Sequence, residues 1–325
     1  ITVGVVNVGL TEALVGLMLS AWLMRLVARR GTPRLLWPPL TIPLLVLLGI
    51  LLVSSLGAAS LAHSTKELLK WTEVLALYVL AANEMGGRWS RALVFILLGT
   101  GAVVALHGIY QFLFQVGPEG FVLFDRFMRA HGTFEQPNPY GGYLGLVLPL
   151  AVGLILAGIV RLGGRIAWPW MVWAGGCGTL MVVALAMSWS RGAWLGFVAA
   201  LAAIALAALA RSGRVVAVLG GVTIAVLAYA LLATGLTRLP PSIVQRFADF
   251  WPYLAFMDVR GIEVTDANFA VLERMAHWQA AIGMWTDHPW IGVGIGNYAA
   301  AYSQYALPLW PLDLGHAHNY YLNIA

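Results

Sequence analysis

Long apolar runs recur along this chain, and they restrict its fold more than any other feature. Each run has about 20 residues, enough for a helix to cross roughly 30 Å of hydrocarbon. Hydrophobic residues make up 60% of the 325 residues and charged residues only 10%, whereas a soluble domain carries roughly 25% charged residues. The sequence therefore predicts an all-α polytopic membrane protein with spans at 3–26, 36–56, 67–83, 92–115, 140–160, 166–187, 193–210 and 215–236.

Basic residues are divided unevenly between alternate loops, and this predicts an orientation. Under the positive-inside rule the richer set of loops is cytoplasmic. Segment 128–145, the turn before residue 191 and the stretch after residue 236 then share the extracytoplasmic side. The net charge of +5 reflects this topology, so we expect no nucleic-acid partner. The richer loops hold Arg25, Arg29, Arg30, Arg34, Arg88, Arg91, Arg161, Arg165, Arg211 and Arg214, and the others hold Lys66, Lys70, Arg126, Arg129 and Arg191.

The chain changes character after the last apolar run. Six of the 14 acidic residues lie between Asp249 and Asp287, and "ERMAHWQAAIGMW" has the spacing of an amphipathic helix. We therefore expect N-terminal transmembrane helices at 1–120, core transmembrane helices at 121–236, and a large extracytoplasmic loop with the start of the next helix at 237–325. The chain begins without methionine and stops inside an apparent helix start, so we expect a fragment of a longer protein.

Metal and cofactor chemistry finds little support in the sequence. Cys177 is the single cysteine, which excludes a disulfide or a cysteine-based metal site within the chain. No DxD or HExxH pattern occurs, and the "GVGIG" run at 292–296 has the wrong spacing for a dinucleotide fingerprint. We expect neither a metal nor a cofactor.

Two arginines stand next to turns on the predicted extracytoplasmic side. Arg191, in "SWSRGAWLG", either snorkels to the headgroups or clamps an anion, because a guanidinium binds phosphate oxygens in a bidentate manner. Ser188 and Ser190 could add hydroxyl donors beside it. Arg129 opens "RAHGTFEQPNPYGG", where Gly141 and Gly142 would allow a close backbone approach. A simple turn before a helix explains that segment equally well.

Histidines and a third arginine follow in the large loop. Arg274 and His277 lie three residues apart, one turn along the expected amphipathic helix; a solvated helix face explains them equally well. His316 and His318, in "GHAHNYYLN", lie where the chain returns to the membrane. A neutral imidazole there suits a general base at pH 7, and an interfacial histidine among belt tyrosines is the alternative.

Four of these segments resemble one known family. "RAHGTFEQPNPYGGYL", "SWSRGAWLG", "ERMAHWQAAIGMWTDHPWIGVGIGNY" and "HAHNYYL" occur in the order and spacing of the O-antigen ligase and polymerase superfamily. The resemblance runs from about residue 125 to 325, and the first 120 residues are similar only in hydropathy. It implies a metal-independent glycosyltransferase with a GT-C-like helical bundle and a large extracytoplasmic loop, in the cytoplasmic (inner) membrane.

The resemblance also implies substrates and residue roles. The donor would be a glycan on undecaprenyl diphosphate, and the acceptor a hydroxyl of lipid A–core, of a growing polysaccharide or of a protein, with membrane lipids around the site. Arg191 and Arg274 would bind the diphosphate, with Arg129 a weaker third candidate, and His318 would activate the acceptor. A transporter of bicarbonate or of a lipid-linked sugar is the competing class. The sequence does not separate ligase from polymerase or protein glycosylation, and it does not name the sugar.

Overall fold

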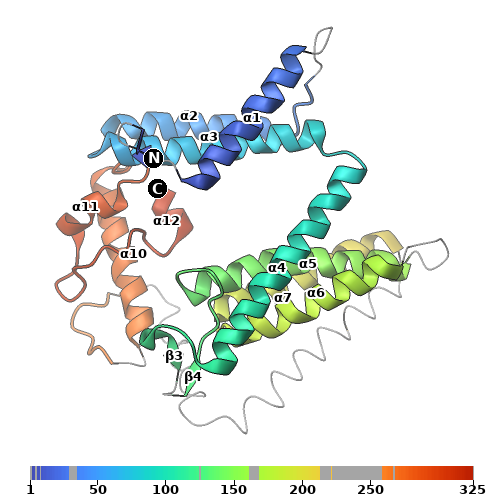
Figure 1. Cartoon of the computed structure of the whole chain (residues 1–325). Coiled ribbons are helices and arrows are strands. Elements are labelled where there is room, and N and C mark those ends of the chain that lie inside the picture. Colours follow the sequence, from blue (N-terminus) through green and yellow to red (C-terminus); the bar gives the residue numbers. More distant parts are fainter. Residues whose placement is uncertain are drawn as a thin grey trace. The chain divides into compact units, whose positions relative to one another are not determined.

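The computed structural model describes most of the chain, in two compact units. The described residues are 2–3, 6–7, 9–28, 35–123, 126–160, 168–212, 221, 258–265 and 268–324. One unit combines residues 1–86 with residues 243–325, and the other comprises residues 87–242 (Figure 1). The predicted span 215–236, except residue 221, and the predicted loops at 29–34 and 161–165 lie outside the described residues.

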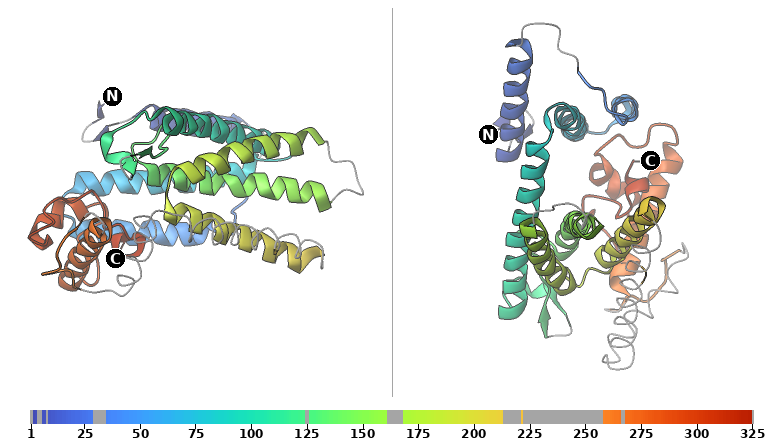
Figure 2. Two further views of the ribbon diagram at one scale, coloured as in Figure 1. Left: turned by 90° about the horizontal axis from the view of Figure 1, so that it is seen from below. Right: turned by 90° about the vertical axis from the view of Figure 1, so that its right-hand side faces the viewer.

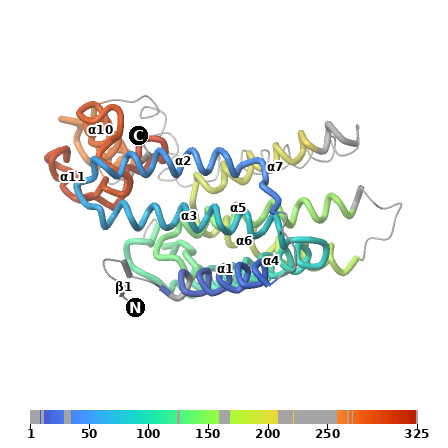
Figure 3. Tube along the Cα trace, turned by 90° about the horizontal axis from the view of Figure 1, so that it is seen from above, coloured from blue at the N-terminus to red at the C-terminus, as the bar shows by residue number. Residues whose placement is uncertain are grey.

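The N-terminal part of the first unit is built on a helical hairpin. After the short antiparallel strands β1 (Thr2–Val3) and β2 (Val6–Asn7), the chain forms α1 (Leu10–Ala28), α2 (Thr41–Ser54), the 3-10 turn η1 (Ser55–Gly57) and α3 (Leu61–Glu84). Helices α2 and α3 lie side by side (Figure 3). Helix α1 packs on α3, where Glu84 accepts a hydrogen bond of 3.2 Å from the Trp22 indole and lies 3.5 Å from Arg25.

The C-terminal part of the first unit is a small helical layer. It contains α10 (Phe269–Asp287), α11 (Tyr298–Tyr305) and the short α12 (Tyr320–Ile324). Helix α10 packs against both of the others. Its buried side chains take part in two apolar clusters. In one they pack with Tyr298, Tyr302 and Ala317, and in the other Leu272 of α10 packs with Leu307 and Trp310. The amphipathic helix expected over "ERMAHWQAAIGMW" is therefore present.

A glycine-rich turn at 291–297 fastens this layer to the α2–α3 hairpin. The fully buried Asn297 accepts a hydrogen bond from the Ser60 N–H at 2.8 Å and donates one to the Ser64 hydroxyl at 2.9 Å. Gly294 has φ +91°, and a Cβ there would lie 2.6 Å from the Cβ of Ala58. The glycines of the "GVGIG" run thus serve a close backbone contact rather than nucleotide binding.

The second unit is a bundle of apolar helices. It contains α4 (Arg88–Phe114), η2 (Glu119–Phe121), the β3 (Val122–Leu123) and β4 (Phe127–Met128) hairpin, α5 (Pro137–Val160), α6 (Trp168–Met187) and α7 (Arg191–Ser212). Helix α6 packs against α4 and α5, and α7 packs against α5 (Figure 2). Gly101 faces the sulfur of Met181, which lets α4 and α6 approach closely, as small residues do between membrane helices.

The predicted fold class is confirmed. Among the described residues, three helices are long and apolar enough to cross a membrane, at Arg88–Phe114, Pro137–Gly158 and Trp168–Met187. Shorter apolar helices lie at Thr41–Gly57 and Arg191–Ala207. Because these helices are apolar around their whole circumference and still leave many large side chains exposed, hydrocarbon is the solvent that suits them.

Candidate active site

Arg129 is tied to neighbouring turns in the second unit. Its Nε donates to the Ser188 carbonyl at 2.9 Å, and one Nη donates to Oδ1 of Asn138 at 3.0 Å. The Ala130 N–H also bonds the Met187 carbonyl at 3.0 Å. These bonds join the segment before α5 to the turn between α6 and α7. Arg129 therefore has a structural role whatever else it binds.

Gln111 of α4 bonds the same segment, although the sequence motifs do not include this residue. Its Oε1 accepts from the N–H groups of His131 and Gly132 at 3.1 and 2.7 Å. Its Nε2 donates to the Gly132 carbonyl at 2.9 Å and lies 3.1 Å from Nε2 of His131. A glutamine within an apolar run is the sequence feature that could have indicated this role, because an amide that becomes buried requires hydrogen-bond partners.

Arg191 is the first residue of α7 and directly follows a tight turn. Trp189 in that turn has φ +52°, a left-handed conformation that non-glycine residues adopt rarely. The buried Ser188 hydroxyl donates to the Leu185 carbonyl at 2.7 Å and accepts from the Ser190 N–H at 3.2 Å. The expectation that Ser188 donates to a ligand beside Arg191 is therefore wrong, because its one hydroxyl hydrogen is used inside the turn.

The two glycines at the start of α5 behave differently. A Cβ on Gly141 would lie 3.0 Å from the Cβ atoms of Ser190 and Ala193, so this glycine lets α5 approach the turn before Arg191. Gly142 faces open space. The expected close approach is confirmed for Gly141 and wrong for Gly142.

His318 occupies a strained loop in the first unit, just before α12. Its φ is +53°, and Leu314 and Gly315 in the same loop also have positive φ. Within the described part of the chain, its Nε2 is buried and has no hydrogen-bond partner. An orphaned buried nitrogen in a strained loop is costly, and such features gather where a ligand is bound.

Two other histidines surround that imidazole. The His316 ring lies 4.2 Å from the His318 ring, edge to face, and its Nδ1 accepts the His318 backbone N–H at 3.2 Å. The His277 ring lies 5.6 Å from the His318 ring, also edge to face. His277 is buried, with its Nδ1 2.7 Å from the Tyr298 hydroxyl and its ring stacked on Tyr302 at 4.8 Å.

Burial lowers the pKa values of two of these imidazoles. Burial, together with the neighbouring His316, Arg274 and His277, lowers the pKa of His318 to about 4. Burial also lowers the pKa of His277, and it raises the pKa of the Tyr298 phenol. A neutral, unpartnered imidazole nitrogen is a proton acceptor at physiological pH.

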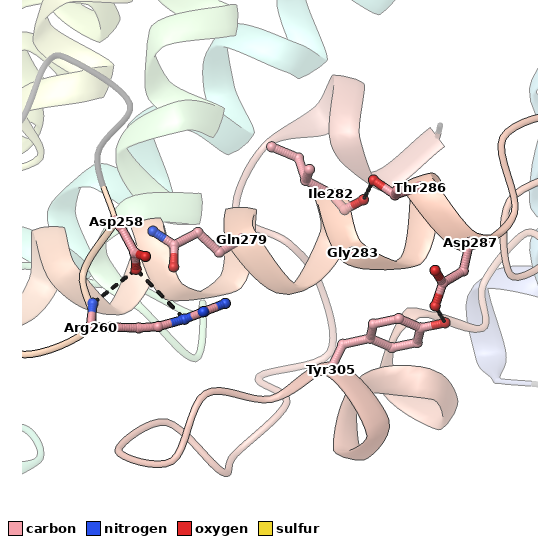
Figure 4. A pocket seen from close by; sticks show the side chains of 8 residues that line it. All are labelled: Asp258, Arg260, Gln279, Ile282, Gly283, Thr286, Asp287 and Tyr305. Atoms are coloured by element: carbon pink, nitrogen blue, oxygen red, sulfur yellow. Dashed lines mark hydrogen bonds and ion pairs between the residues drawn. The ribbon is translucent and has the colours of Figure 1, made fainter.

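Helix α10 presents two different faces. Arg274, His277 and Trp285 lie within one third of its circumference, given 100° per residue. The opposite face lines an open pocket of about 480 Å³ in which the polar groups bond one another (Figure 4). There Tyr305 donates to Asp287 at 2.8 Å, and Arg260 lies 3.7 Å from Asp258. The candidate chemistry therefore belongs to the first face.

The structure places the four predicted site residues in two pairs. Arg129 and Arg191 flank one turn of the second unit, and Arg274 and His318 lie in the first unit, where the Arg274 charge acts on the imidazole. The sequence pattern indicates His277 only as a neighbour of Arg274 and gives no sign of the roles of Tyr298, Tyr302 and Asn297. Among the described residues, no group of three His, Cys, Asp or Glu side chains could hold a metal ion.

The fold defines a polytopic membrane protein, and its first unit carries a cluster of histidines close enough to Arg274 to feel its charge. Residues 176–325 match the family described as O-antigen ligase. This match supports the O-antigen ligase and polymerase superfamily and implies an enzyme of the ligase or polymerase type. No curated protein and no solved structure matches it. Arg191, Arg274 and His318 lie inside the matched range, and Arg129 lies before it.

Proposed function

We propose that the protein transfers a glycan from undecaprenyl diphosphate to an acceptor hydroxyl, with His318 as the general base. The observation that carries the assignment is the buried Nε2 of His318, which has no partner among the described residues. Burial and nearby positive charge keep the His318 imidazole neutral at physiological pH, and its Nε2 accepts a proton in the tautomer that carries the hydrogen on Nδ1. A hydroxyl that donates to this nitrogen would supply the missing hydrogen bond.

The proposed reaction is an inverting displacement at the anomeric carbon. The acceptor O–H gives its proton to His318 while its oxygen forms the new bond to the anomeric carbon. The bond from that carbon to the phosphate oxygen breaks, and the electron pair leaves with undecaprenyl diphosphate. Base catalysis of this kind typically contributes about 10²–10⁴-fold.

Arginines serve the leaving group in this proposal. Arg191 and Arg274 bind the diphosphate and stabilise the charge that grows on it, which in such reactions is usually the larger contribution. Arg274 is exposed on the α10 face that also carries His277. Arg129 supports the turn before Arg191 through its bond to Ser188, and contact with the donor is a secondary role for it.

The predicted orientation places the loop and site on the extracytoplasmic side of the inner membrane, and two contacts support the grouping of segments on which it depends. Ser54, at the end of α2, donates to the Ile291 carbonyl at 2.8 Å, so the α2–α3 turn and the large loop lie on one side. Arg129 likewise joins the segment before α5 to the turn before α7. Charge bias assigns all four of these segments to the extracytoplasmic side. The organisation into helices at 1–120 and 121–236 and a loop at 237–325 follows from the same proposal.

The test is transfer by the purified protein in lipid nanodiscs. Undecaprenyl-diphosphate glycan and a hydroxyl acceptor should give product without an ion gradient, and EDTA should leave the rate unchanged, because we propose a metal-independent reaction. Acceptors of each class, lipid A–core, polysaccharide and peptide, separate ligase, polymerase and protein-glycosylating activities. Turnover that requires an ion gradient and leaves the donor intact would instead support a transporter. The three candidate spans among the described residues contain no Asp or Glu. Of the predicted spans, only the one at 3–26 holds an acidic residue well inside it, Glu12, and this scarcity disfavours an ion-coupled carrier.

A further inference from the structure

A cleft of about 300 Å³ lies on the His277 side of α10, away from the pocket of Figure 4. Its walls come from α10, the 291–296 turn, the first half of α3 and the segment from Gly315 to Asn323. All of these belong to the first unit. The volume is at the lower end of the range for small-molecule sites, about 300–1,000 Å³.

The charges in this cleft balance. Glu67 and Lys70 of α3 line it and form a salt bridge with each other. Their side chains remain 28% and 56% exposed, so both still reach a ligand. A diphosphate there would meet the Glu67 carboxylate as well as the Lys70 ammonium. A neutral polyhydroxylated ligand instead donates to the carboxylate and accepts from the ammonium, so the pair favours a sugar over an anion.

An indole completes the lining. Trp285 of α10 is 47% exposed and contributes to the cleft. It lies on the same face of α10 as Arg274, eleven residues or about three turns further along the helix. The flat apolar surface of a tryptophan with polar groups opposite suits a pyranose ring, which has apolar C–H faces and a polar rim.

The imidazole of His316 connects the cleft to the proposed base, His318. His316 lines the cleft, and its Nδ1 accepts the His318 backbone N–H. We propose that this cleft binds the sugar of the acceptor glycan and that Trp285, Glu67 and Lys70 are its recognition residues. This inference rests on the proposed function, since it assigns the sugar to the acceptor because of the position beside His318.

Binding of neutral methyl hexosides to the full chain in nanodiscs tests the proposal, with saturation-transfer NMR as the readout. Trp285→Ala should weaken binding roughly tenfold, because it removes the stacking surface. Trp290→Ala is the matched control: Trp290 is 94% exposed, lies in the same segment and does not line the cleft. Glu67→Gln and Lys70→Met should each weaken binding as well, which guards against a local folding defect in Trp285→Ala.

Three results would overturn the assignment. Equal hexoside binding by the Trp285 and Trp290 variants would mean that the cleft is not the sugar site. Displacement of the hexosides by inorganic pyrophosphate would make it a donor-phosphate site. Binding seen in detergent but lost in nanodiscs would mean that lipid fills it.

Kinetics separate this inference from the proposed function. In the transfer assay, Trp285→Ala should raise the acceptor KM about tenfold with little change in kcat, and the affinity for the lipid-linked donor should stay unchanged. A parent protein that binds hexosides through Trp285 but never consumes undecaprenyl-diphosphate glycan would refute the glycosyl-transfer proposal and the acceptor assignment, leaving only a sugar-binding cleft. A parent that transfers glycan while Trp285→Ala keeps its acceptor KM would refute the cleft alone.

Discussion

The turn before Arg191 and the loop around His318 differ in how their polar groups are hydrogen-bonded. Around the turn, polar groups bond one another: Arg129 bonds the Ser188 carbonyl and Asn138, and the Ser188 hydroxyl bonds Leu185. Around the loop, His277 and His316 are bonded, yet the Nε2 of the imidazole they surround has no partner in the described structure. The hydrogen bonds of the first region fix its shape, whereas the second region leaves one buried nitrogen without a hydrogen bond from the described residues.

Both regions contain backbone strain, and they differ in how close the strained residue lies to the candidate site residue. In the turn, the left-handed residue is Trp189, two positions before the arginine, whereas in the loop it is His318 itself. Strain of about 1–3 kcal/mol persists only where the surroundings enforce it. This difference predicts that changes at the loop affect chemistry and changes around the turn affect stability first.

The largest effect should come from the loop. His318→Ala should reduce glycan transfer by about 10²-fold or more, because the proton acceptor is lost, while binding of the lipid-linked donor persists. Transfer and donor binding are measured in the full chain. His107→Ala, at an exposed position of α4, should leave both unchanged. Transfer at parental rate in His318→Ala would remove the base from the mechanism.

Arg191→Lys should come next, with a loss of roughly 10–10²-fold in kcat/KM. An ammonium keeps the positive charge but not the bidentate fork of the guanidinium, so the leaving diphosphate is held less well. Arg126→Lys, an exposed arginine at the β3–β4 hairpin, provides the control. A lysine variant at 191 that matches the parent would mean that Arg191 only snorkels to the headgroups.

His277→Phe and Tyr298→Phe probe the support behind the base, and each should lower kcat about tenfold. The phenylalanine at 277 keeps the stack on Tyr302, whereas the 2.7 Å contact with Tyr298 is lost. Because the two residues act through one contact, the double variant should be no worse than either single one. The acid limb of the pH profile should shift as well, since the surroundings of His318 change. Additive losses with an unchanged pH profile would indicate a purely structural role.

Arg129→Ala tests whether the hydrogen bonds around the turn before Arg191 stabilise the protein. Its bonds to Ser188 and Asn138 involve a charged donor, so we expect a loss of about 1–3 kcal/mol in the free energy of unfolding. Arg126→Ala should change it by less than about 0.5 kcal/mol. Thermal unfolding in nanodiscs measures both. If Arg129→Ala keeps full stability but loses donor binding, Arg129 is a phosphate ligand rather than a support.

The smallest expected effect concerns pH: the transfer rate should not change between pH 7 and pH 5. Because the pKa of His318 is lowered from 6.5 to about 4, the imidazole stays neutral and the transfer rate should be flat over this range. The unfolded chain binds a proton near pH 6.5, so stability falls as the pH decreases from about 6.5 to 4. Histidine NMR titration of the full chain measures the pKa directly. An acid limb near pH 6.5 would show that the imidazole is not held neutral.

The sequence alone determined the class of fold and the separate motifs. Apolar length and low charge dictate membrane helices, because hydrocarbon accepts no unpaired backbone groups. Turn residues and helical periodicity likewise located the turn at 188–191 and the helix carrying Arg274 and His277. The predictions for Arg191, Arg274 and His318 come from short motifs that are contiguous in sequence and resemble those of the family.

The packing of the helices sets which polar side chains are hydrogen-bonded and which are not. Hydropathy does not show that the Ser188 hydroxyl is consumed by Leu185, that Gly142 faces open space, or that Gln111 anchors the Arg129 segment. Nor does it place Tyr298 against His277 across 21 residues of chain. Hydrogen bonding and burial join residues distant in sequence, and they set which polar atoms keep a partner. Nε2 of His318 has no hydrogen-bond partner among the described residues, and no local sequence pattern predicts this.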